Sequence, residues 1–183
     1  MSSSNKAVFL DRDGVICYDV HYMSSPDQFT LMPGVGEGIQ KLNEMGFLVI
    51  VVTNQSGLKR GLITEDNLKK IHERMISELS AYGARIDDIF VCPCLPEDDC
   101  ECRKPKPGMI LEAARKHSID LKSSYMIGDK QIDSDAGKAA GCKTILITED
   151  ASAVADFKVK NFIEAVEIII KEEKKDEGIL GYG

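Results

Sequence analysis

Acidic and polar side chains follow three apolar segments of this 183-residue chain, AVFL, FLVIVV and YMIG. The residues at these three ends are Asp11, Asp13, Thr53, Asn54 and Asp129. If the segments are strands of one parallel sheet, their ends meet at one edge, where α/β proteins bind ligands. Clustered carboxylates repel one another unless a cation or a proton separates them. The pattern therefore indicates a divalent-cation site, most simply for Mg²⁺, which combines one or two carboxylates with substrate phosphate.

A site of this kind is suited to phosphoryl transfer. A carboxylate can attack phosphorus to form an acyl phosphate, and a second carboxyl two residues further on can protonate the leaving oxygen. Fixed cations can hold the oxygens of the transferred group, and Arg103, Lys104 and Lys106 form a local basic cluster that can attract an anionic ligand. Taken singly, each motif has a structural explanation, since Asp-Gly favours turns and Thr-Asn-Gln can cap a helix. Their combination is what points to chemistry.

A second cluster consists of four cysteines within eleven positions of a chain that has six. They are Cys92, Cys94, Cys100 and Cys102, spaced as two C-x-C pairs. In a reducing cytosol such spacing favours metal binding, and four thiolates can enclose one zinc ion in a closed tetrahedral site. We therefore expect a structural zinc site in the loop 91–104, with a disulfide in oxidised preparations as the alternative. The isolated Cys17 and Cys142 are expected to be buried hydrophobes.

The segments that must position these residues alternate between two periodicities. Short apolar runs rich in β-branched residues predict strands at 7–11, 47–53, 89–92, 125–128 and 143–147. Amphipathic patterns between them predict helices at 35–45, 64–83, 109–116, 133–140 and 162–174. This alternation predicts an α/β fold in which helices cover both faces of a mainly parallel sheet.

The length and composition predict a single domain, residues 1–175, with the charged and then glycine-rich residues 176–183 as a mobile tail. No segment has the ~18 to 20 apolar residues of a membrane helix, and no apolar signal segment opens the chain, so we expect a cytoplasmic protein. A formal net charge of −7 argues against nucleic acid or anionic lipid as partners, because both would be repelled. We expect a monomer that binds a small phosphorylated metabolite.

Four motifs carry a family resemblance. They are LDRDGVI, VVTNQSG, RKPKPG and MIGDKQIDSDAGKAAG, and in this order they resemble the motifs of the haloacid dehalogenase (HAD)-like phosphatases. The resemblance covers residues 6–150, and the cysteine loop that runs into CRKPKPGM narrows it to the branch of heptose bisphosphate and histidinol-phosphate phosphatases. It implies a Rossmann-like HAD fold, a three-layer sandwich, and hydrolysis through an aspartyl phosphate.

Carried over by position, the resemblance implies that Asp11 is the nucleophile and that Asp13 is the general acid and then the base. Mg²⁺ would be held by Asp11, the backbone carbonyl of Asp13, and Asp129. The residues implied to bind the phosphoryl group or the rest of the substrate are Thr53, Asn54, Lys104, Asp19, His21, Tyr22, Arg103 and Lys130. Asp133 matches the family's second acidic position in the fourth motif, where it either touches the metal or orients Lys104.

The chain departs from the family pattern at Cys94, where a histidine commonly stands, although four thiolates would still bind zinc. The segments 14–33 and 57–64 are too short for the cap domain that related phosphatases insert there, so we expect an uncapped pocket. His72, on the predicted helix 64–83, is expected to be structural or to face solvent.

The resemblance favours Mg²⁺-dependent hydrolysis of the 7-phosphate of D-glycero-D-manno-heptose 1,7-bisphosphate. Histidinol phosphate is an alternative substrate for the same chemistry. An alternative from another class is a non-enzymatic zinc module that binds a protein or nucleic acid through the cysteine loop. Phosphotransfer at a polynucleotide end is disfavoured, because no basic groove is evident in this acidic chain.

Overall fold

The computed structural model describes residues 4–180, and its strands form one sheet. The strands are β1 (Ala7–Leu10), β2 (Leu48–Asn54), β3 (Asp88–Cys92), β4 (Tyr125–Gly128), β5 (Lys143–Ile147) and β6 (Phe157–Val159). Every pairing is parallel, in the order β3-β2-β1-β4-β5-β6, which confirms the predicted parallel sheet. Strand β6 was not predicted, because its three residues include an exposed lysine and give no apolar run.

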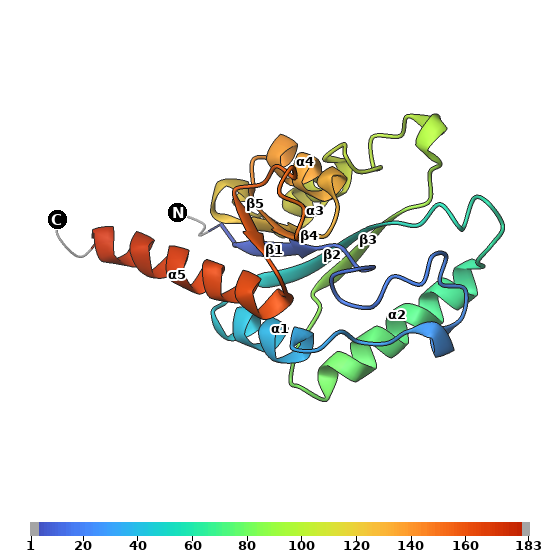
Figure 1. The fold of residues 1–183 in the computed structure, drawn as a ribbon, viewed down its shortest axis with the longest axis horizontal. Helices are drawn as coiled ribbons and strands as arrows, with labels where there is room; N and C mark the ends of the chain where they lie inside the picture. The colour runs from blue at the N-terminus through green and yellow to red at the C-terminus, as the bar shows by residue number, and fades with distance from the viewer. Residues whose placement is uncertain (1–3, 181–183) are drawn as a thin grey trace.

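The helices cover both faces of this sheet, as expected for a three-layer sandwich. They are α1 (Val35–Glu44), α2 (Glu65–Ser80), α3 (Gly108–His117), α4 (Gln131–Ala140) and α5 (Phe162–Leu180). Figure 1 shows α3 and α4 on one side of the strands and α1, α2 and α5 on the other. Helix α5 runs beyond the predicted end at residue 174, so the expected tail 176–183 overlaps it, and residues 181–183 lie outside the described chain.

The central strands are buried on both faces, which explains their continuous apolar sequences. In β1, Val8 and Leu10 pack into the core under α1, α2 and α5, whereas Ala7 and Phe9 pack into the core under α3 and α4. Strand β2 alternates between the same two cores. Burial on both faces holds these strands in place, and therefore also the residues at their ends.

Helix α2 illustrates how local sequence sets the helix boundaries. The hydroxyl of Thr64 accepts a hydrogen bond from the backbone N–H of Asn67 at 3.1 Å, as an N-cap does. The buried side chains of α2 recur every three or four residues, the spacing of one helix face, and are Leu68, Ile71, Met75 and Leu79. None of the helices among residues 4–180 combines the length and apolar content that crossing a membrane requires.

The strand order places the candidate site. The chain proceeds from β1 through β2 to β3 in one direction and then returns to the other side of β1 as β4. Ligands of open α/β sheets bind at such a reversal, beyond the carboxyl ends of the strands. Asp11 follows β1, Asn54 ends β2 and Asp129 follows β4, so the three polar ends lie side by side.

Candidate active site

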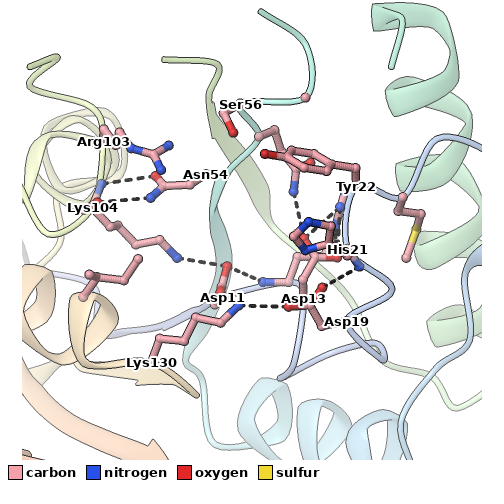
Figure 2. A pocket seen from close by; sticks show the side chains of 15 residues that line it. Asp11, Asp13, Asp19, His21, Tyr22, Asn54, Ser56, Arg103, Lys104 and Lys130 are labelled. Carbon is pink, nitrogen blue, oxygen red and sulfur yellow. Dashed lines mark hydrogen bonds and ion pairs between the residues drawn. The ribbon is translucent and has the colours of Figure 1, made fainter. Parts of the chain in front are cut away.

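A pocket of about 290 Å³ opens at these strand ends (Figure 2). Nine of the predicted site residues line it: Asp11, Asp13, Asp19, His21, Tyr22, Asn54, Arg103, Lys104 and Lys130. Thr53 and Asp129 do not line the pocket themselves but contact residues that do. The hydroxyl of Thr53 accepts a hydrogen bond from Gln55, and a carboxylate oxygen of Asp129 lies 3.9 Å from the amine of Lys130.

Three carboxylates meet beside this pocket. Oxygen atoms of Asp11, Asp129 and Asp133 all lie within 4.8 Å of one another. Burial raises the pKa of Asp11 to about 7 and the pKa of Asp129 to about 6. The Oδ1 atom of Asp129 is buried and has no hydrogen-bond partner among the described residues. An unpaired carboxylate oxygen in an acidic cluster fits a hard divalent cation such as Mg²⁺.

Lys104 supplies the positive charge of this cluster, and it is almost completely buried. Its amine lies 2.9 Å from Asp11 and 2.7 Å from Asp133, and it donates to the carbonyl of Val52 at 2.9 Å. Burial lowers the pKa of Lys104, but the two carboxylates outweigh this effect and the net pKa is raised. The amine therefore stays protonated. Asp133, whose role the sequence left open, contacts Lys104 directly.

Asp133 also shapes the loop that carries Asp129. Its Oδ2 atom accepts hydrogen bonds from the backbone N–H groups of Asp129 at 3.2 Å and Lys130 at 3.0 Å. These N–H groups lie at the start of α4, where a carboxylate is favoured by the unpaired donors of a helix N-terminus. Helix α4 begins at Gln131, two residues before the predicted start at Asp133.

Gly14 makes room for Asp129, and we predict that Gly14→Ala weakens Mg²⁺ binding at least about 10-fold. The residue has φ +87°, and a Cβ added there would overlap the carboxylate of Asp129. The matched control is Gly46→Ala, where φ is +84° but nothing lies within 4 Å. Calorimetric titration with Mg²⁺ measures the effect. Equal losses in both variants would show that backbone strain alone is responsible.

Asp13 is held by two residues to which sequence reasoning assigned no role. Nη2 of the buried Arg12 lies 3.0 Å and 2.9 Å from the two carboxylate oxygens of Asp13, and Nε lies 3.2 Å from one of them. The side-chain amide of Gln55 donates to Asp13 at 2.9 Å. Both residues belong to the motifs LDRDGVI and VVTNQSG, so the motifs could have marked them as candidates. The sequence did not show that their side chains point toward Asp13.

His72 packs behind Arg12, with its Nε2 atom 3.3 Å from Nη1 of the guanidinium. Burial lowers the pKa of His72 to about 4, and the positive charge of Arg12 lowers it further in the same direction. The imidazole is therefore neutral near pH 7. The expected structural role of His72 is consistent with this placement, because the ring lies between helix α2 and the motif that carries Asp13.

We predict that His72→Gln reduces the loss of folding stability between pH 7 and pH 4.5. The unfolded chain, with a His72 pKa near 6.5, binds more protons than the folded chain between pH 6.5 and 4. Wild-type stability therefore falls as the pH drops through this window, by roughly 2 kcal/mol from His72 alone. Urea unfolding at pH 7 and 4.5 measures the difference, with the exposed His21→Gln as control. An unchanged pH dependence in His72→Gln would contradict the prediction.

The predicted substrate residues form one rim of the pocket. Lys130 pairs with Asp19 at 2.9 Å, and this hydrogen bond lowers the pKa of Asp19. Asp19 in turn accepts from the backbone N–H of His21 at 2.9 Å. His21 and Tyr22 both have positive φ, 52° and 55°, an uncommon conformation for residues other than glycine. Tyr22 lies over Gly57, where a Cβ would come within 3.1 Å of its ring.

Asn54 anchors the basic end of the cysteine loop. Its side-chain amide donates to the carbonyl of Lys104 and accepts from the N–H of Lys104, both at 3.1 Å. Arg103 donates to the carbonyl of Cys94 at 2.8 Å while lining the pocket. The amide of Asn54, which was predicted to bind phosphoryl oxygens, is thus engaged by the backbone of Lys104. This pair of hydrogen bonds fixes Lys104 relative to β2.

The four clustered cysteines converge in the loop 91–104 as predicted from their spacing. Their sulfur atoms form two bonded pairs, Cys92 with Cys102 and Cys94 with Cys100. Sulfur atoms of different pairs are also close, since those of Cys94 and Cys102 lie 3.8 Å apart. This separation matches the edge of a tetrahedron with Zn–S bonds of about 2.3 Å, roughly 3.8 Å. The loop therefore brings the four sulfurs together, and their bonded pairs correspond to the disulfide alternative that the sequence left beside zinc. Cys17 and Cys142 are buried free thiols, as expected.

The pocket has no cap domain among the described residues, as predicted. The segment between β1 and α1 contains one short 3-10 turn, Pro26–Gln28, and the segment between β2 and α2 spans only 55–64. Figure 2 shows the side chains of the rim residues and of Arg103 among those that line the pocket. The rim and the cysteine loop therefore form walls of the pocket.

Known proteins are similar to this chain over most of its length. A family model described as HAD-hydrolase-like matches residues 101–167. The D-glycero-beta-D-manno-heptose-1,7-bisphosphate 7-phosphatase of Rhodopseudomonas palustris is 45% identical, covering 74% of this chain and 79% of that protein. The enzyme of the same name from Pasteurella multocida is 41% identical, covering 90% and 96%. A D,D-heptose 1,7-bisphosphate phosphatase from B. bronchiseptica, solved with magnesium and phosphate, has a TM-score of 0.84, with 34% identity and 91% and 99% coverage.

A parallel sheet with an aspartate after β1, a buried lysine beside it and an acidic cluster that includes Asp129 after β4 is typical of a HAD-like phosphatase, a phosphoric monoester hydrolase. Within that class, the chain belongs to the D-glycero-D-manno-heptose-1,7-bisphosphate 7-phosphatase family. This membership argues against the alternative of a non-enzymatic zinc module.

Proposed function

We propose that the protein hydrolyses the 7-phosphate of D-glycero-D-manno-heptose 1,7-bisphosphate in the presence of Mg²⁺ and releases heptose 1-phosphate and inorganic phosphate. The observation that carries the proposal is the buried amine of Lys104 between Asp11 and Asp133, at the pocket that Asp13 also lines. The names of the similar proteins supply the substrate, and those of the curated relatives specify its beta form.

The first chemical step would use Asp11 as the nucleophile. An oxygen of its carboxylate attacks phosphorus, the bond between phosphorus and the C7 oxygen breaks, and Asp13 gives its proton to that leaving oxygen. Lys104, which contacts Asp11, would offset negative charge on the phosphoryl oxygens. When held by Asp11, the Asp13 carbonyl and Asp129, Mg²⁺ would supply further positive charge at the same oxygens.

The second step would return the enzyme to its starting state. Asp13, now a carboxylate, takes a proton from a water molecule whose oxygen attacks the phosphorus of the aspartyl phosphate. The bond between phosphorus and the Asp11 oxygen breaks, and inorganic phosphate leaves. Asp13 is again protonated for the next cycle, so one carboxyl serves as acid and then as base.

The residues of the rim would select the sugar. Asp19, His21, Tyr22 and Lys130 line one side of the pocket and Arg103 the other, so a bisphosphate meets cationic side chains beyond the reacting centre. A substrate with one phosphate and a cationic end, such as histidinol phosphate, would place like charge near Arg103 and Lys130. This charge distribution favours the bisphosphate.

Phosphate release from the two anomers of the bisphosphate and from histidinol phosphate, each with Mg²⁺, tests the proposed substrate. We expect the highest kcat/KM for one anomer of the bisphosphate. Faster release from histidinol phosphate would instead identify the protein as a histidinol-phosphate phosphatase. Comparably poor rates on all three compounds would overturn both assignments.

We further propose that the cysteine loop holds one structural zinc ion as four thiolates. A closed site of protein ligands has no open position for water, so the ion would brace Arg103 and Lys104 without taking part in the reaction. Thiol titration of the denatured, unreduced protein distinguishes zinc from disulfides. Six reactive thiols and one zinc per chain support the proposal, whereas two reactive thiols, those of Cys17 and Cys142, would contradict it.

We also propose that the protein functions as a cytoplasmic monomer. The formal net charge of −7 supports it, because like-charged copies of the chain repel one another. Sedimentation equilibrium with and without Mg²⁺ measures the oligomeric state, and a stable dimer would contradict the monomer.

A further inference from the structure

Gln55 occupies the junction between two residues of the proposed mechanism. It follows β2, is 7% exposed and lines the pocket. Its side-chain nitrogen Nε2 lies 2.9 Å from the hydroxyl of Thr53 and 2.9 Å from Oδ2 of Asp13. Its backbone N–H donates to the carbonyl of Cys92 at 2.7 Å, which ties it to the end of β3. Both the backbone and the side-chain amide of Gln55 are therefore fixed by hydrogen bonds.

The chemistry of the neighbours fixes the orientation of the Gln55 amide. In its carboxylate form, as the base of the second step, Asp13 only accepts hydrogen bonds, so the NH₂ group, not the carbonyl oxygen, faces Asp13. An NH₂ group has two hydrogens, and one reaches Asp13 while the other reaches Thr53. Both donors of the amide are thereby used.

This arrangement also determines what the Thr53 hydroxyl can do. Because its oxygen accepts from Gln55, its own hydrogen must be donated elsewhere. No acceptor for that hydrogen is found among residues 4–180. Thr53 immediately precedes the pocket-lining Asn54, so a phosphoryl oxygen of a bound substrate that reaches the Thr53 hydroxyl would provide one. Gln55 thereby sets Thr53 as a donor.

Arg12 holds Asp13 as well, but in a different way. Its buried guanidinium binds both carboxylate oxygens and contributes a full positive charge. Gln55 is neutral, so it adds direction at Oδ2 without changing the charge around Asp13. Of the two contacts, only the one from Gln55 links Asp13 to Thr53.

We propose that Gln55 is a positioning residue that orients the Asp13 carboxyl and the Thr53 hydroxyl together. The proposal rests on the proposed phosphatase function and deepens it. Through one amide, the group that transfers the proton and the group that binds the phosphoryl oxygen keep a fixed relative position. Loss of the amide would leave Asp13 held by Arg12 and by the weak contact of the Cys17 thiol at 3.7 Å, and would free the Thr53 hydroxyl to turn.

Gln55→Met tests this role, because methionine has similar length and cannot donate a hydrogen bond. With the heptose bisphosphate, whose alkoxide leaving group needs a proton, we expect kcat to fall about 100-fold while KM changes less than about 3-fold. The matched control is Gln40→Met, because the side chain of Gln40 donates to Glu44 within α1, and no other partner of it is found among the described residues. It should leave kcat unchanged.

p-Nitrophenyl phosphate provides a readout that a merely structural role would not alter. Its leaving group needs no proton, so Gln55→Met should still form the aspartyl phosphate rapidly, but hydrolysis of that intermediate still needs Asp13 as base. We expect a burst of about one equivalent of p-nitrophenolate followed by slow turnover. Gln55→Asn, which keeps the amide but is too short to reach both partners, should behave in the same way.

The outcomes separate this proposal from the proposed function. An active wild-type enzyme with unchanged kcat in Gln55→Met would overturn the role of Gln55 only. Equal losses on both substrates without a burst would also overturn it, because they indicate general damage to the site. A wild-type enzyme that is inactive on every phosphate monoester would instead refute the proposed function.

Discussion

Replacing Asp11 by Asn is expected to abolish phosphate release, with kcat falling at least about 10⁴-fold. A carboxamide does not attack phosphorus to form an acyl phosphate, so the two-step route is closed. The fold should persist, because the amide has the shape of the carboxyl and its oxygen can still accept from the Arg12 N–H, now 2.8 Å away, and from Lys104. Phosphate release and thermal unfolding monitored by circular dichroism measure the two effects.

The control for this experiment is Asp135→Asn. Asp135 belongs to the same acidic motif as Asp133 but is exposed on α4, where it accepts only from Gln131. Its replacement should change kcat by less than about 2-fold. Measurable turnover in Asp11→Asn, together with a normal control, would refute the assignment of Asp11 as nucleophile.

The second large effect is expected for Lys104→Met, which should lose both stability and activity. Removal of the amine leaves Asp11 and Asp133 buried beside each other without the cation that now separates them. Breaking a buried ion pair from one side typically costs about 3 to 5 kcal/mol, because the remaining charge is uncompensated. We expect a loss of this size in urea unfolding without Mg²⁺, and a fall in kcat of at least about 10³-fold.

Two further variants identify the cause of the loss. Lys106 lies next to the same loop, but its amine pairs with the exposed Asp99 and Glu101, so Lys106→Met should leave stability nearly unchanged. The double variant Lys104→Met with Asp133→Asn removes one uncompensated carboxylate and should recover part of the stability but none of the activity. Equal destabilisation by Lys104→Met and Lys106→Met would rule out the buried cluster as the cause.

The sheet could be predicted because burial on both faces leaves a plain signal, a continuous apolar run that ends in polar residues. The same rule located Asp11, Asn54 and Asp129, since the carboxyl ends of parallel strands share one edge. Helix boundaries were also close where capping residues mark them, as Thr64 does for α2. Strand β6 gave no such signal and was found only in the structure.

The relations between side chains within the site could not be predicted in the same way. The positions of Asp11 and Asp13 on either side of Arg12 predict that the two carboxylates have different roles. They do not predict that the Arg12 guanidinium bonds to Asp13. Similarly, nothing in the order Thr53-Asn54-Gln55 shows that the first and third side chains bond to each other. These contacts depend on rotamers that packing selects, and packing is a property of the folded chain.

The short segments after β1 and β2 have a kinetic consequence. In enzymes that cover their substrate with a lid or a mobile domain, the opening or closing of that lid is often the rate-limiting step. No separate domain among the described residues must move here for a sugar phosphate to enter or for inorganic phosphate to escape. We therefore expect turnover to be limited by bond breaking and by diffusion through the pocket mouth, and the bound sugar itself to displace the water around the Asp11 carboxylate.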